Sequence, residues 1–141
     1  MSAQDNVALA RKVYDLFNKN QLDKVLELAN SDFEVTLIPF GLTQKGHTGF
    51  TEFMNGFRVA FPDITITITN QIGTDSAVVN EFLVKGTHKG VLMTPAGPIQ
   101  PTGKSINYPV IEAWGIKNGK VSSIRNYFDS ATLMRQLGLI H

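Results

Sequence analysis

The chain has 141 residues, of which 43% are apolar and 18% charged, a composition typical of a folded globular protein with apolar side chains enough for one core. Thirteen basic and twelve acidic residues are scattered along it, so no nucleic-acid or membrane partner is expected. Because cysteine is absent, disulfides, zinc sites with cysteine ligands and thiol chemistry are excluded.

The length predicts a single domain that spans residues 1–141. The N-terminal stretch MSAQDNVALARKVYDLF lacks the unbroken apolar segment of a signal peptide, and no run is long enough to cross a bilayer. A cytoplasmic location is therefore the default expectation.

Apolar residues in the first part of the chain recur mainly at helical spacing. Three helices are predicted, over residues 2–18, 22–29 and 50–60, with a strand over residues 32–40. Ser2 and Asp5 are spaced as a capping pair for the first helix. Pro62 prevents the third helix from continuing.

After Pro62 the apolar period changes from 3.6 to 2, which predicts strands. Four strands are expected, over residues 63–70, 77–88, 105–116 and 120–128. The sequence KNGK supplies a tight turn between the last two. Helices followed by a meander of strands predict an α+β domain in which a curved antiparallel sheet wraps around the helices. A short C-terminal helix follows, with Asp129 as its cap and Gly138 at its stop.

One connection is unusually long. Residues 90–104, GVLMTPAGPIQPTGK, contain three prolines and three glycines between two predicted strands. Loops of this length are often functional, so this segment is a candidate lid over the open end of the sheet.

Alternation groups the residues of the last two predicted strands by the face that they share. Glu112 shares a face with Tyr108, Val110 and Trp114, and Asn126 shares a face with Ile124 and Phe128. A regular KNGK hairpin would pair Glu112 with Arg125, whereas a one-residue bulge would put Glu112 beside Asn126 or Ile124. The sequence leaves both registers open.

Glu112 is the main candidate for proton chemistry. Among apolar neighbours its pKa would rise and suit a general acid or base near neutral pH. The alternative is a cross-strand ion pair with Arg125 on a half-exposed face.

Other polar residues have a structural and a functional interpretation. His88 stands at a strand end, where it either reaches the cavity mouth or only bonds a neighbouring backbone group. Tyr14, on the inward stripe of the first helix, could donate a hydrogen bond to a ligand or belong to the core. Asp129 is interpreted as a helix cap. Together with His47 and His141, His88 is too dispersed for a metal site.

Several strings resemble the SnoaL-like polyketide cyclase family, a branch of the nuclear transport factor 2-like superfamily. They are KGHTGFTEFMNGFRVAFPDI, VKGTHKG, PTGKSI, a KNGKV turn and YFDSATLMRQLGL, in the family's order and over nearly the whole chain. The resemblance implies a cone-shaped, cystatin-like α+β barrel. In it a bent sheet and three N-terminal helices enclose an apolar pocket, and two copies pair through the outer sheet face as a homodimer.

The family's catalytic positions carry different residues here. SnoaL-like cyclases use an aspartate on the last strand and a histidine on the preceding strand to close a ring by an intramolecular aldol reaction. By the resemblance, the aspartate position falls at Asn126 and the histidine position at Glu112. An asparagine cannot accept a proton at neutral pH, so proton chemistry would fall on Glu112.

Two related enzyme families match less of the site. Limonene-epoxide hydrolases are similar to the RNYFD string, but their aspartate falls at Asn126 and their further Arg and Asp fall at Met93 and Pro95. Ketosteroid isomerases have their base near Leu37 and an oxyanion-hole carboxylic acid at Glu112. A neutral acid at Glu112 could still donate a hydrogen bond.

The resulting hypothesis is a cofactor-independent polyketide or ester cyclase, or an isomerase, that transfers a proton next to a carbonyl of an apolar, ring-bearing substrate. The alternatives are a non-catalytic small-molecule-binding protein, an interaction module with a filled cone, and an enzyme like the ketosteroid isomerases or epoxide hydrolases. The predicted catalytic residues are Glu112, Asn126 and His88, with no metal. The predicted substrate-binding residues are Tyr14, Phe17, Leu37, Met54, Phe57, Phe82, Tyr108, Val110, Trp114, Ile124 and Phe128.

Overall fold

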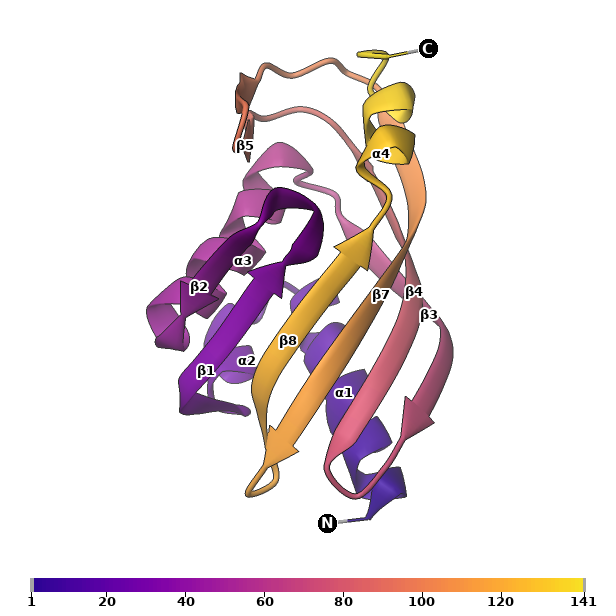
Figure 1. Cartoon of the computed structure of the whole chain (residues 1–141). Helices are drawn as coiled ribbons and strands as arrows, with labels where there is room; N and C mark the ends of the chain where they lie inside the picture. The colour runs from indigo at the N-terminus through magenta and orange to yellow at the C-terminus, as the bar shows by residue number, and fades with distance from the viewer. Residues whose placement is uncertain (1, 141) are drawn as a thin grey trace.

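A curved six-stranded sheet forms the body of the protein in the computed structural model, which describes residues 2–140 (Figure 1). Its strands lie in the order β2-β1-β8-β7-β4-β3. Their bounds are β1 (Ala29–Leu37), β2 (Leu42–Lys45), β3 (Thr65–Gly73), β4 (Ala77–Thr87), β7 (Ser105–Lys117) and β8 (Lys120–Phe128). The predicted α+β class, with helices near the N-terminus and a curved sheet, is confirmed.

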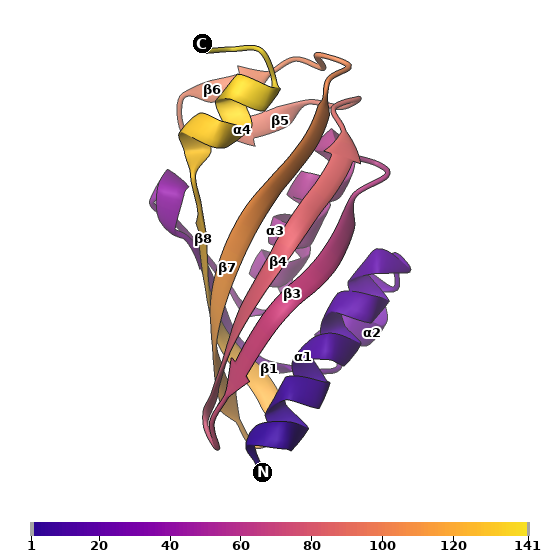
Figure 2. The ribbon, with the colours of Figure 1, turned by 90° about the vertical axis from the view of Figure 1, so that its right-hand side faces the viewer.

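Three helices cover the inner face of the sheet, and a fourth lies at one end (Figure 2). They are α1 (Ala3–Asn18), α2 (Leu22–Leu26), α3 (Gly46–Ala60) and the C-terminal α4 (Ser130–Gln136). The predicted capping box is confirmed, because the Ser2 hydroxyl accepts from the Asp5 amide and the Asp5 carboxylate accepts from the Ser2 amide. The predicted cap of α4 is also present, since Asp129 accepts from the Ala131 amide at 3.0 Å.

The sheet is mixed rather than purely antiparallel. β1 runs parallel to β8, with Val35 opposite Ile124 and Leu37 opposite Asn126, whereas the other pairs of neighbouring strands are antiparallel. A parallel neighbour needs a long crossover connection, and here residues 38–119, more than half of the chain, separate β1 from β8. The expectation of an antiparallel sheet is therefore corrected at this one pairing.

The hairpin of β7 and β8 fixes the register of the inward-facing residues. At its turn Asn118 and Gly119 both have positive φ, of 54° and 74°, as a type I′ turn requires. Beyond the turn the register shifts between Gly115 and Ile116, and Glu112 lies opposite Asn126. Of the two registers that the sequence left open, the bulged one is the observed one, and an ion pair with Arg125 is excluded.

The long loop of residues 90–104 folds into a small hairpin of its own. Its strands are β5 (Leu92–Thr94) and β6 (Gly97–Ile99), and they lie at the same end of the sheet as α4 (Figure 2). Gly90 is tightly seated, because a Cβ atom there would lie 1.9 Å from the backbone oxygen of Val59. Its amide donates to Ala60 at 3.1 Å, which anchors the hairpin to the end of α3.

The segment before α3 differs most from the sequence-based expectation. The predicted strand ends at Leu37, and Ile38–Phe40 form a short 3-10 helix, η1, where Pro39 offers no amide to a ladder. α3 begins at Gly46, four residues earlier than expected, and α2 is shorter than expected. The short strand β2 follows η1 and pairs with β1.

The outer face of the sheet carries some apolar side chains. Ile111 and Tyr127 expose about two fifths of their surface, at 42% and 41%. The homodimer implied by the resemblance stays a prediction, which analytical ultracentrifugation would test. None of the helices within residues 2–140 is long and apolar enough to cross a membrane.

Candidate functional site

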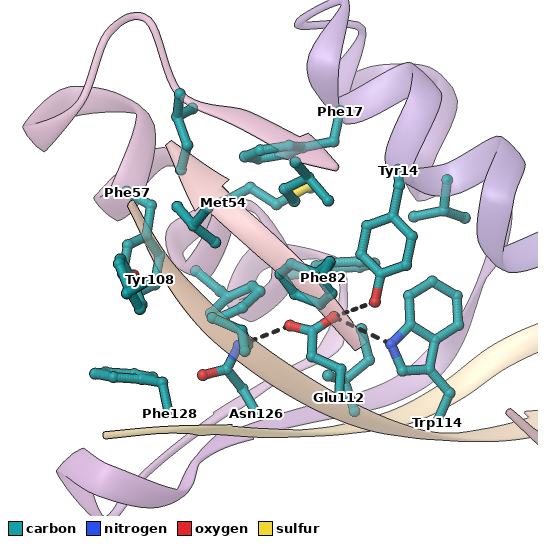
Figure 3. A pocket seen from close by; sticks show the side chains of 18 residues that line it. Tyr14, Phe17, Met54, Phe57, Phe82, Tyr108, Glu112, Trp114, Asn126 and Phe128 are labelled. Carbon is teal, nitrogen blue, oxygen red and sulfur yellow. Dashed lines mark hydrogen bonds between the residues drawn. The ribbon is translucent and has the colours of Figure 1, made fainter. Parts of the chain in front are cut away.

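A pocket lies between the helices and the inner face of the sheet (Figure 3). The free space inside it is about 60 Å³, room for a few water molecules, so the interaction module with a filled cone remains an alternative. The predicted lining residues of the pocket are Tyr14, Phe17, Met54, Phe57, Phe82, Tyr108, Val110, Trp114, Ile124 and Phe128, together with Glu112 and Asn126. Sequence reasoning did not assign six others to it: Val13, Phe50, Phe53, Ile64, Ile66 and Val84.

Three donors hold the carboxyl group of Glu112. The Tyr14 hydroxyl donates to Oε1 at 2.6 Å, and the indole nitrogen of Trp114 donates to the same oxygen at 3.2 Å. The side-chain amide of Asn126 donates to Oε2 at 2.8 Å. Figure 3 shows these bonds converging on one side chain. Oε1 therefore carries two donors, and Oε2 carries one and keeps a free lone pair.

The fold brings these groups together from three elements. Alternation along β7 turns both Glu112 and Trp114 inward, and the bulged hairpin sets Asn126 of β8 opposite Glu112. Tyr14 reaches the carboxyl group from the buried side of α1, where its ring packs against Phe82 at 5.0 Å between centroids. Glu112 and Asn126 are both about 95% buried.

Burial raises the pKa of Glu112, and the hydrogen bonds from Tyr14, Asn126 and Trp114 partly oppose this rise. The two ion pairs among residues 2–140 lie at the surface and leave Glu112 without a cation. The 2.6 Å bond from Tyr14 lies in the range of charge-assisted O–H···O⁻ bonds. The arrangement thus supports a carboxylate whose proton affinity is increased, as a general base near neutral pH requires.

Two tyrosines of the pocket stay protonated. Burial, and then the charge of Glu112, raise the pKa of Tyr14 well above its usual value, and the same two causes raise the pKa of Tyr108. The Tyr14 hydroxyl is committed to Glu112. Tyr108 is a buried, neutral donor that lines the pocket.

Asn80 is a polar neighbour of the site to which sequence reasoning gave no role. It lies opposite Glu112 on β4, is fully buried, and accepts a hydrogen bond from Gln71 at 2.8 Å. Its own amide nitrogen has no partner within the described chain. The signal in the sequence AVVNEFLV was an asparagine on a strand face that is otherwise apolar, formed by Val78, Phe82 and Val84.

His88 does not join this site. Although fully buried, it is not one of the pocket-lining residues. Its Nδ1 accepts from the Thr102 amide at 3.1 Å and lies 3.0 Å from the Thr102 hydroxyl, so the ring ties the two ends of the 90–104 loop together. Burial also lowers the pKa of His88. The predicted auxiliary role at the mouth is corrected to a structural one. β4 ends at Thr87, so the strand alternation that predicted an inward side chain no longer applies at His88.

The predictions for Leu37, Tyr14 and Asn126 also differ from the structure. Leu37 is buried but does not line the pocket, because it stands at the last position of β1. Tyr14 was expected to donate to a ligand or to belong to the core, and Asn126 was predicted as a catalytic residue; both side chains donate to Glu112. Residues 2–140 contain no group of three or more histidine or acidic side chains placed to hold a metal ion, and His141 lies outside the described residues.

A cone of curved sheet closed by helices around an apolar pocket defines the nuclear transport factor 2-like class. Similar solved structures include a candidate SnoaL-like polyketide cyclase from Jannaschia sp. CCS1, with a TM-score of 0.86 and 17% identity over 99% of this chain and 95% of that one. IdmH, a candidate polyketide cyclase from Streptomyces antibioticus, has a TM-score of 0.78 and 22% identity over 94% and 97% of the two chains.

A third similar structure is a nuclear transport factor 2-like protein of unknown function from Burkholderia pseudomallei K96243. It has a TM-score of 0.77 and 19% identity over 94% of this chain and 97% of that one. At these identities the likeness shows the fold alone. No curated protein matches the chain by sequence.

The family model for SnoaL-like polyketide cyclases matches residues 7–137. The chain therefore belongs to the SnoaL-like polyketide cyclase family, and the resemblance noted in its sequence is confirmed.

Proposed function

We propose that the protein is a cofactor-independent cyclase or isomerase in which Glu112 transfers a proton next to a carbonyl of an apolar, ring-bearing substrate. The observation that carries this proposal is a buried carboxyl group with a raised pKa, facing a pocket whose other walls are aromatic and aliphatic. The family membership supports the reaction class, and the burial and raised pKa of Glu112 support its assignment as the base.

The proton-accepting atom is Oε2 of Glu112. Oε1 already accepts from Tyr14 and Trp114, whereas Oε2 accepts from Asn126 alone. The carboxylate removes a proton from the carbon next to the carbonyl, the C–H electrons form the enolate double bond, and the carbonyl π electrons move to oxygen. In an isomerisation the new carboxylic acid returns the proton to another carbon. In a cyclisation the enolate carbon bonds to a second carbonyl of the same molecule, and the acid protonates the resulting alkoxide.

The substrate carbonyl needs a donor of its own during this step, because negative charge develops on its oxygen. Tyr108 is suited to this role, since it lines the pocket and its hydroxyl is protonated. Tyr14 and Trp114 contribute indirectly by holding Glu112 in place. Atoms are only redistributed within the substrate, so the reaction consumes no cofactor.

A non-catalytic binding protein is the second candidate. The observation that favours it is Asn126 at the position that the family resemblance assigns to the catalytic aspartate. Such a protein would bind ring-bearing molecules in the same pocket without accelerating proton transfer.

The two candidates differ in one measurable reaction. We would incubate the protein with 2-tetralone in deuterated buffer and follow deuterium uptake next to the carbonyl by proton NMR. An enzyme of the proposed kind accelerates this exchange, and Glu112→Gln abolishes the acceleration, because a neutral amide cannot take the proton. A binder gives saturable ligand shifts but no faster exchange.

A matched control separates loss of the base from damage to the fold. Tyr127→Phe changes a hydroxyl on the outer face of β8, where the residue is 41% exposed, and should leave the exchange rate unchanged. If Glu112→Gln folds, binds 2-tetralone and exchanges at the wild-type rate, Glu112 is not the base.

A further inference from the structure

The polar side chains around Glu112 include donors that are already paired and an acceptor that is not. The hydroxyl of Tyr14, the indole N–H of Trp114 and the side-chain amide of Asn126 all donate to Glu112. The side-chain oxygen of Asn126 is a buried acceptor without a partner among the described residues, whereas the unpartnered amide nitrogen of Asn80 belongs to a residue that does not line the pocket. The Asn126 oxygen belongs to a residue that lines the pocket.

The orientation of the Asn126 amide follows from the charge of its neighbour. An ionised carboxylate has no hydrogen to donate, so the NH₂ group of Asn126 must face Oε2 of Glu112, as observed at 2.8 Å. The amide oxygen is thereby directed away from Glu112. Figure 3 shows it on the side of Tyr108 and Phe128. A buried acceptor without a partner is unfavourable, and a bound molecule can supply that partner.

We propose that Asn126 Oδ1 selects ligands that carry a hydroxyl donor, in the form of a phenol or an enol, on a flat ring system. This inference rests on the proposed function, since it concerns a ligand bound in the same pocket. A hydroxyl hydrogen directed at Oδ1 forms the missing bond, whereas a ligand carbonyl or ether at this place sets two acceptors against each other. The aromatic walls, including Phe82 and Phe128, favour a flat ring as the bearer of that hydroxyl.

The proposed ligand preference should reverse when Glu112 is replaced by glutamine. In Glu112→Gln the oxygen of the new side-chain amide can keep the bonds from Tyr14 and Trp114, so its NH₂ group faces Asn126. Asn126 then turns its oxygen toward this donor and presents its own NH₂ to the pocket. The preferred ligand changes from a donor to an acceptor. Proton transfer to Oε2 during the proposed reaction acts in the same way, so the amide donor of Asn126 becomes available when the enolate forms.

The test is a pair of probes that differ in one hydrogen-bond donor. Fluorine NMR titrations would give the dissociation constants of 6-fluoro-2-naphthol and its methyl ether for the wild-type protein. We expect the naphthol to bind at least about tenfold more tightly, because a polar group left unpaired in a buried site is strongly discriminated against. In Glu112→Gln this ratio falls to one or reverses in favour of the ether.

Two further variants complete the design. Asn126→Leu removes the selecting oxygen and should leave no preference beyond that caused by the size of the methyl group, and Tyr127→Phe on the outer face should keep the wild-type ratio. If Asn126→Leu fails to fold in a thermal melt, the reversal in Glu112→Gln still decides the question. A merely structural role of Asn126 would not produce such a reversal.

The outcomes separate this inference from the proposed function, because binding is measured without turnover. A naphthol preference that reverses in Glu112→Gln, without deuterium exchange into 2-tetralone, supports the hydroxyl selection and refutes the enzyme. Deuterium exchange into 2-tetralone without a naphthol preference supports the enzyme and refutes the hydroxyl selection. Equal affinities in the wild type, an unchanged ratio in Glu112→Gln, or no binding of either probe up to its solubility limit would overturn the proposed selection.

Discussion

Replacing Tyr14 by phenylalanine tests the energetics of the buried carboxylate. The variant keeps the ring, which packs against Phe82 and Trp114 at 5.0 and 5.2 Å between centroids, and loses only the hydroxyl that donates to Glu112 at 2.6 Å. Hydrogen bonds to charged groups contribute about 1.5–3 kcal/mol, and those between neutral groups about 0.5–1.5 kcal/mol. Tyr14→Phe should therefore lower the free energy of unfolding more when Glu112 is ionised than when it is neutral.

The dependence on pH has a definite sign. Because the folded state raises the pKa of Glu112 above its usual 4.5, its contribution to stability is fully present below about pH 4.5 and is lost as the pH rises through the folded-state pKa. Tyr14→Phe raises this pKa further. The difference in stability between wild type and variant should therefore grow from about 0.5–1.5 kcal/mol in acid to about 1.5–3 kcal/mol above the folded-state pKa.

Urea unfolding followed by circular dichroism at a series of pH values measures this difference. Tyr127→Phe, which removes a hydroxyl from the outer face of the same sheet, is the matched control and should change stability by less than about 0.5 kcal/mol. A loss in Tyr14→Phe that is the same in acid and at neutral pH would refute the account, since it would mean that the hydroxyl does not stabilise a charged carboxyl group.

Three further predictions concern the stability of the fold around the pocket. Gly90→Ala should destabilise the fold by about 3 kcal/mol or more, because its Cβ would lie 1.9 Å from a backbone oxygen of α3. Gly56 lies in α3 with open space around it, so Gly56→Ala should stabilise the fold by about 0.5–1 kcal/mol. Thermal melts of both glycine variants measure these effects, and similar melting temperatures would contradict the packing described. Asp129→Ala removes the cap of α4 and should cost about 1 kcal/mol in the same assay, while an unchanged melting temperature would show that the cap is dispensable. Because burial lowers the pKa of His88, stability should fall as the pH drops below about 6.5, and a His88→Gln variant that keeps this acid-side loss would assign it to another group.

The faces of the strands could be predicted from the sequence because side-chain alternation is a local property. Parity put Glu112 and Trp114 on one face of β7, and Asn126 with Ile124 and Phe128 on one face of β8; in the structure Glu112, Trp114 and Asn126 are all buried. The Asp129 cap was likewise predictable, since its hydrogen bonds reach only three residues along the chain.

The register depended on a local irregularity that composition does not reveal. Gly115 allows close approach of β8, where a Cβ would lie 2.6 Å from the Ser123 hydroxyl, and the extra residue of the bulge is Ser122. That single residue decides whether Glu112 faces Arg125 or Asn126.

Long-range contacts were the least predictable part of the structure. The parallel pairing of β1 with β8, and the hydroxyl of Tyr14 reaching a carboxyl group 98 residues away, depend on how the whole sheet curves. The role of His88 was misjudged for the same reason, because the loop that covers it returns to the strand end only in the folded protein.

The central claim is that Glu112 is a buried carboxyl group whose proton affinity is raised. Carbon NMR of protein labelled at the glutamate carboxyl carbons, with Glu112→Gln used to assign the resonance, measures this directly. The account predicts that the Glu112 resonance titrates with a pKa clearly above 4.5 and that Tyr14→Phe moves it higher still. A midpoint at or below 4.5 would contradict the account, because the carboxylate would then be too weak a base for the proposed proton transfer.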